Sequence, residues 1–227
     1  MAVAHVQTAQ TVSNTFRASE TTASMTVSEG SLLIVAAAAW NAPPAITVSS
    51  VQLDGTTGFS FDKGVSHGSG GRIELWSFAN VSAGAHTVTV TWASALTYKT
   101  VYLMEVSGTA TSSVQDGAGA SAVGDSGNPT TGAYNATATS FWVSAVETGS
   151  ISIVAGSGWT IPTNGSEIGT PGSAIEHQAN PGVGTLTGDF TTDGSGWSVV
   201  GMAYLVAGAG GGSGTVRKRS RATLGVG

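Results

Sequence analysis

The chain has 227 residues, of which 41% are hydrophobic, 9% are charged and none is cysteine. This length suits one large all-β domain or two small ones, and the hydrophobic content is enough for a sizeable core. The lack of cysteine excludes a disulfide framework and a thiolate metal site. A low charge content combined with 33 glycines is typical of short strands joined by turns.

The charges are unevenly placed along the chain. All 13 acidic residues precede residue 217, whereas the last eleven residues contain a basic cluster. Its members are Arg217, Lys218, Arg219 and Arg221, and they follow the glycine-rich stretch Ala207 to Gly214. The split predicts a domain over residues 1–207 and a Gly-rich linker with a basic, flexible interaction tail over residues 208–227.

Alternation of apolar and polar residues predicts β-strands through most of residues 1–207. No window has the spacing of an amphipathic helix, and no signal peptide is expected at the N-terminus. The segment from Ser31 to Trp40 is apolar throughout but too short to span a bilayer, so a fully buried strand is expected. The other expected strands are 3–12, 16–27, 46–53, 59–61, 73–78, 86–92, 101–106, 134–146, 151–154, 159–161, 174–178, 185–190 and 197–206.

Three expected strands follow one another between Gly71 and Gly108, as in a meander. A weaker copy of this stretch recurs about 100 residues later, because Ile73–Glu74 matches Ile175–Glu176 and Gly108 matches Gly208. Upstream, Ser31 to Trp40 is similar to the segment that begins SFWVSAV. Either a duplication or monotonous strand patterning accounts for this. Either one predicts two halves that pack as the two sheets of an antiparallel β-sandwich, jelly-roll-like by preference.

The sequence contains no constellation that predicts catalysis, a metal site or a cofactor. The four histidines lack the spacing of metal ligands, and a calcium ion in a loop stays open. Glu74 and Glu105 could face each other across neighbouring strands, but a glycosidase would also need an aromatic-lined cleft. Of the six tryptophans, Trp159 in GSGWT is the one expected at the surface, where it could contact a sugar.

The basic cluster leaves three interpretations open: binding to a phosphate backbone, binding to an acidic protein surface such as a neighbouring copy, or a solvated tail. Four charges are few for packaging DNA, and no aromatic residues are interleaved for stacking on bases. An acidic protein partner is therefore favoured over nucleic acid.

The order of several segments resembles a family of jelly-roll-like β-sandwich domains found in phage virion proteins and in bacterial surface proteins. The resemblance extends over roughly residues 1–207, and the segments that carry it are GSLLIVAAAAW, VSSVQLDG, RIELWSFANVSAGAHTVTVTW, VYLMEVSG and GWSVVGMAYLVAG. The family offers no catalytic residues to carry over. Among phage proteins, sandwiches of this size resemble capsid decoration, or cement, proteins.

This resemblance implies a non-enzymatic structural protein on the exterior of a virion capsid. The expected partners are the major capsid protein or neighbouring virion subunits, in a homo-oligomer for which a trimer is favoured, with no membrane involved. Arg217, Lys218, Arg219 and Arg221 would contact the partner. The alternative is a carbohydrate-binding module of a bacterial surface protein or a phage tail fibre, and a hydrolase is the weakest option.

Overall fold

The computed structural model describes residues 2–40, 46–150, 152–167, 171–179, 182–193 and 196–208, and within these ranges every regular element is a β-strand. The antiparallel β-sandwich predicted from the sequence is confirmed. None of the described residues forms a helix long and apolar enough to cross a membrane.

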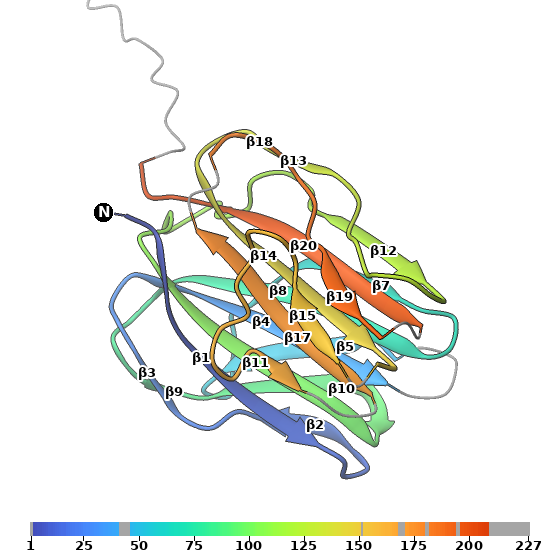
Figure 1. The fold of residues 1–227 in the computed structure, drawn as a ribbon. Coiled ribbons are helices and arrows are strands. Elements are labelled where there is room, and N and C mark those ends of the chain that lie inside the picture. Colours follow the sequence, from blue (N-terminus) through green and yellow to red (C-terminus); the bar gives the residue numbers. More distant parts are fainter. Residues whose placement is uncertain are drawn as a thin grey trace, which may run out of the picture.

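Two five-stranded antiparallel sheets form the centre of the molecule (Figure 1). The first inner sheet has the order β1 (Ala4–Ser13), β11 (Tyr98–Ser107), β4 (Ser31–Trp40), β8 (Gly71–Val81) and β7 (Ser60–Ser66). The second inner sheet has the order β12 (Ala120–Gly124), β20 (Trp197–Leu205), β14 (Ser140–Thr148), β17 (Gly172–Ala179) and β16 (Ser166–Glu167).

Further strands cover the outer face of each inner sheet. The first is covered by a sheet of β2 (Arg17–Thr21), β10 (Val88–Leu96), β5 (Val48–Leu53) and β6 (Thr56–Thr57), with the ribbon β3 (Met25–Val27) and β9 (Gly84–His86). The second is covered by two ribbons, β13 (Tyr134–Ala136) with β18 (Gly184–Leu186) and β15 (Ile153–Ala155) with β19 (Phe190–Thr192).

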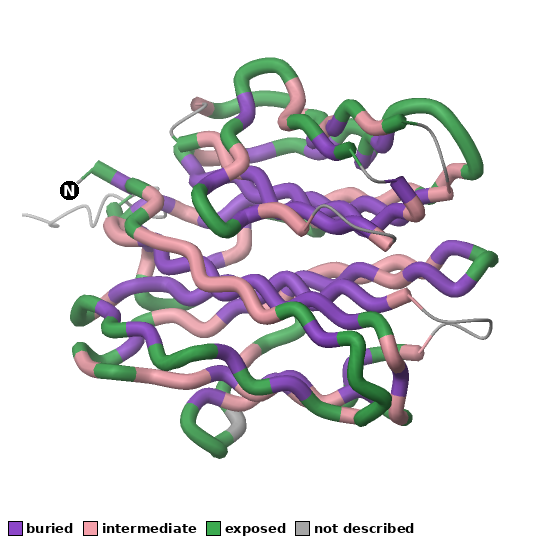
Figure 2. Tube along the Cα trace, turned by 60° about the horizontal axis from the view of Figure 1, so that its bottom comes forward, coloured by how far each residue is buried: buried purple, intermediate pink, exposed green. Residues whose placement is uncertain are grey.

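The molecule therefore has four layers, more than the single pair of sheets that the sequence predicts. Leu33 and Val35 of β4 pack toward the first outer sheet, whereas Ile34 and Ala36 of the same strand pack toward the second inner sheet. Figure 2 shows the resulting run of buried strands through the middle of the molecule. A strand buried on both faces needs apolar residues at every position, which explains the continuous apolar run of β4.

Gly71 to Gly108 is not a meander, which corrects the prediction. β8 and β11 both pair with β4, and β10 lies between them in the sequence but in the outer sheet. The burial patterns give the reason: Val88, Val90 and Trp92 bury only one face of β10, whereas β8 and β11 are apolar enough to be covered on both.

Corresponding strands occupy corresponding places in the two inner sheets. In the first, Ala37 of β4 lies between Glu74 and Val101. In the second, Ser144 of β14 lies between Glu176 and Gly201. This order agrees with the predicted match of Glu74 to Glu176. Gene duplication and the jelly-roll assignment stay predictions, as does the domain boundary at residue 207.

The two inner sheets share one apolar core, to which β4, β8 and β11 contribute on one side and β14, β17 and β20 on the other. Two tyrosine hydroxyls cross this interface. Tyr102 donates to the carbonyl oxygen of Ser173 at 2.7 Å, and Tyr204 donates to the Asp62 carboxylate at 2.6 Å. The halves are thus joined by both apolar packing and directional hydrogen bonds.

Candidate functional site

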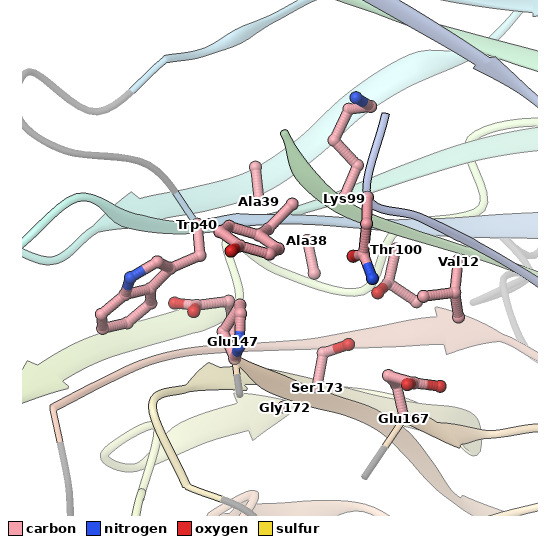
Figure 3. Close-up of a pocket in the computed structure, with 13 residues that line it drawn as sticks. Val12, Ala38, Ala39, Trp40, Lys99, Thr100, Glu147, Glu167, Gly172 and Ser173 are labelled. Carbon is pink, nitrogen blue, oxygen red and sulfur yellow. The ribbon is translucent and has the colours of Figure 1, made fainter. Parts of the chain in front are cut away.

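A cavity lies at one end of the interface between the inner sheets, where the shared core stops (Figure 3). It has about 70 Å³ of space for water-sized groups. Strands β1, β4 and β11 line it from the first inner sheet, and β14, β16 and β17 line it from the second. The side chains that give it chemical character are Asn14, Trp40, Tyr98, Glu147, Glu167 and Ser173.

Glu147 is the most unusual residue of this cavity. Its side chain is 1% exposed, and neither carboxyl oxygen has a hydrogen-bond partner. Burial raises the pKa of the Glu147 carboxyl well above its usual range, because the charged form loses its hydration without gaining a partner. A buried, unpaired carboxyl group is costly for folding, so its presence calls for an explanation other than stability.

The local sequence places Glu147 in the cavity through strand periodicity. In β14, Phe141, Val143 and Ala145 point into the shared core, and Glu147 is the next residue on that face. Opposite it, a methyl group built on Gly71 would overlap the Glu147 carboxylate, so only glycine leaves room there. Glu147 was not predicted as a site residue, although a single charged residue that continues an apolar alternation is a sequence signal for it.

Aromatic and polar groups surround the carboxyl group. Trp40 ends β4 and lies opposite Tyr98 in the strand pairing. In Figure 3, the carboxyl group of Glu147 lies beside Trp40, and Glu167 lines the other end of the cavity. Glu167 accepts a hydrogen bond from the Gln10 amide at 3.3 Å.

Lys99 lies between the cavity residues Tyr98 and Thr100 on β11, but its side chain points to the opposite face of that strand. It donates there to the carbonyl oxygens of Thr15 and Arg17. The positive charge of this lysine is therefore held outside the cavity, and the two glutamates give the lining an acidic character.

Exposed apolar side chains border the cavity. Val12 and Tyr98 are each 41% exposed, and both line its mouth. We call Val12 and Tyr98 the rim patch. Grouped exposed apolar side chains are a feature of protein–protein contact surfaces.

A second buried carboxyl group, Glu176, lies beneath the outer ribbons of the second half. One of its oxygens accepts the Gly156 amide at 3.1 Å, and the other has no partner. Burial raises the pKa of Glu176 to about 9. Its counterpart Glu74 is better satisfied, since it binds Arg72, the Trp76 indole and the Val48 amide.

Other candidate residues from the sequence do not form a site. Glu74 and Glu105 lie on strands that flank β4, so they do not face each other across neighbouring strands as expected. His5 stacks on His177 with ring centroids 4.7 Å apart, and burial lowers the pKa of His177 to about 4. Across the described ranges, no group of three or more histidine and acidic side chains could hold a metal ion.

Trp159 is buried, which corrects the expectation that it is a surface aromatic. It is 8% exposed and packs with Tyr134 and Trp142. Hydrogen bonds in both directions between the Thr160 and His177 backbones bring the segment back onto the second inner sheet, so the indole turns inward. The basic cluster Arg217, Lys218, Arg219 and Arg221 lies outside the described residues.

Comparisons with protein-family models, with curated proteins and with solved structures give no match to this chain. The resemblance to phage virion sandwiches therefore stays a prediction.

Proposed function

We propose that this protein is a non-enzymatic structural protein of a phage virion, a capsid decoration or cement protein that binds the outside of the head and bridges capsid subunits. The observation that carries the proposal is the rim patch beside the acidic cavity, because it offers a partner both apolar area and an unsatisfied carboxyl group. Two inner sheets covered on both faces support a rigid body behind that surface.

The test of this role is association with particles. Virions from the natural source are banded in a density gradient, and the chain is quantified by mass spectrometry. We expect a fixed ratio to the major capsid protein that fits capsid symmetry, and a lower ratio for particles assembled with Val12→Ser. A chain found only in the soluble fraction would refute the role.

Carbohydrate binding by a bacterial surface protein or a tail fibre is the second candidate. The combination that favours it is an aromatic pair, Trp40 and Tyr98, beside polar Asn14 and Glu167 in one cavity. Aromatic faces that stack on sugar rings, with few polar groups to fix orientation, are typical of small-ligand sites. A glycan array should then give hits that Trp40→Ala abolishes, while the capsid role predicts no hits.

A further inference from the structure

The cavity around Glu147 is built to receive a positively charged group. Glu147 is almost fully buried, and both its oxygens lack a partner. Glu167 adds a second carboxyl group, and the faces of Trp40 and Tyr98 can hold a cation through their π-electrons. The amine of Lys99 is engaged on the other side of its strand, so it does not neutralise the cavity.

The chain carries a segment that complements this cavity. Arg217, Lys218, Arg219 and Arg221 are four cations within five residues, in a chain whose acidic residues all come earlier. An arginine or lysine head would supply hydrogen-bond donors to Glu147, and its apolar stem would lie along the rim patch. The carboxyl groups and the aromatic faces of the lining thus both suit a basic side chain.

Chain geometry favours a neighbouring copy as the donor of that side chain. Leu205, near the last described residue, pairs with Ser140 at the start of β14, whereas Glu147 lies seven residues further along that strand, roughly 23 Å away. The nine steps from Gly208 to Arg217 span at most about 30 Å. Arg217 would need an almost straight path to the chain's own cavity, whereas Arg221, thirteen steps from Gly208 and up to about 43 Å away, has length to spare. A neighbouring copy is favoured because β20 ends at the end of β14 that is opposite to Glu147, so the segment starts on the far side of the molecule from its own cavity.

We propose that the cavity at Glu147 binds a basic side chain from residues 217–221 of a second copy, so that copies join head to tail. This inference deepens the proposed assembly role and rests on it for its biological setting. A head-to-tail contact uses two different surfaces, so it closes into a ring when the rotation between copies allows, as in the trimer expected from the sequence.

Sedimentation of the full chain at low and high salt, with three variants, tests this contact. The natural sequence should self-associate with concentration, and high salt should weaken the association. Glu147→Gln should weaken it at least tenfold, as should the variant with Arg217, Lys218, Arg219 and Arg221 changed to Gln. Glu29→Gln, on an exposed turn, is the matched control and should associate like the natural sequence.

A mixture of the two association-defective variants gives the decisive measurement. Glu147→Gln keeps an intact basic segment and the four-residue variant keeps an intact cavity, so an equimolar mixture should regain a 1:1 complex that neither variant forms alone. Denaturation midpoints of all variants show that each is folded, and Glu147→Gln should be at least as stable as the natural sequence. If the variants are folded and stable, a loss of association can be attributed to the loss of the contact and not to unfolding.

Three outcomes would overturn the inference: a chain that stays monomeric at every concentration, Glu147→Gln that associates like the natural sequence, or a mixture that forms no complex. If the second outcome came with glycan binding that Glu147→Gln abolishes, the cavity would be a sugar site. If one of these outcomes is observed but virions still contain the chain, the contact is refuted and the proposed capsid role is not. If the chain forms rings that depend on residues 217–221 but is absent from virions, the capsid role is refuted and the contact is supported.

Discussion

At the scale of single residues, the molecule contains charged groups that its low charge content does not lead one to expect in the interior. Glu20, Glu74, Glu105, Glu147 and Glu176 are all buried. Glu105 is well satisfied by the Ser28 amide and the Ser31 hydroxyl, each at 2.8 Å. Neither carboxyl oxygen of Glu147 has a hydrogen-bond partner, so Glu147 differs from the glutamates that connect strands through hydrogen bonds.

The raised pKa of Glu176 predicts a defined pH dependence of stability. The unfolded carboxyl loses its proton above about pH 4.5, whereas the folded one keeps it up to about pH 9. The folded state therefore binds more protons between these values, and this group lowers stability as pH rises, by at most about 1.4 kcal/mol per pH unit.

Glu176→Gln should remove that loss, so its advantage over the natural sequence should grow from pH 5 to pH 8. Urea unfolding at several pH values measures the difference, and Glu29→Gln is the control on an exposed turn. A difference that does not change with pH would show that the Glu176 carboxyl ionises normally in the folded protein.

Lys99 and Glu20 form a buried ion pair that should matter for stability. The Lys99 amine and the Glu20 carboxylate are 3.4 Å apart, both side chains are fully enclosed, and the amine also holds backbone carbonyls. Lys99→Met should cost about 1–3 kcal/mol, because it leaves the buried carbonyl oxygens of Thr15 and Arg17 without their charged donor, whereas Arg17 still pairs with the Glu20 carboxylate. The urea midpoint measures this, and a loss no larger than that of Lys63→Met, on the edge strand β7, would contradict it.

At the scale of elements, close approach at the β7–β8 hairpin fixes how the two halves meet. The backbone at Gly71 lies against Glu147 and Trp40, whereas Gly68 in the same hairpin has open space around it. Gly71→Ala should lower stability by about 1–3 kcal/mol through overpacking, and Gly68→Ala should change it much less. Equal effects of the two substitutions on the denaturation midpoint would mean that the close approach does not constrain β8.

At the scale of the whole molecule, the shared core predicts that both halves unfold together. Phe141, Tyr102 and Tyr204 are fully buried between the inner sheets, so separating the halves would expose a large apolar area on each. Calorimetry of the full chain should give one transition, with matching calorimetric and van't Hoff enthalpies. Two resolved transitions would show that each half is stable alone.

Local chemistry determined much of this protein before any fold was known. The alternating and fully apolar runs dictated strands and an antiparallel β-sandwich, because the period of a strand is two and apolar residues must leave water. The buried character of β4 followed from its ten-residue run.

Only the tertiary structure decided how the layers stack and where the candidate site lies. Strand patterning does not say which sheet a strand joins, so the transfer of β10 to an outer sheet and the burial of Trp159 were not foreseen. Glu147 and Trp40 are more than a hundred residues apart in the sequence and meet only because the two inner sheets pack face to face. A site assembled across an interface leaves no local signal, since each contributing strand satisfies its own pattern without it.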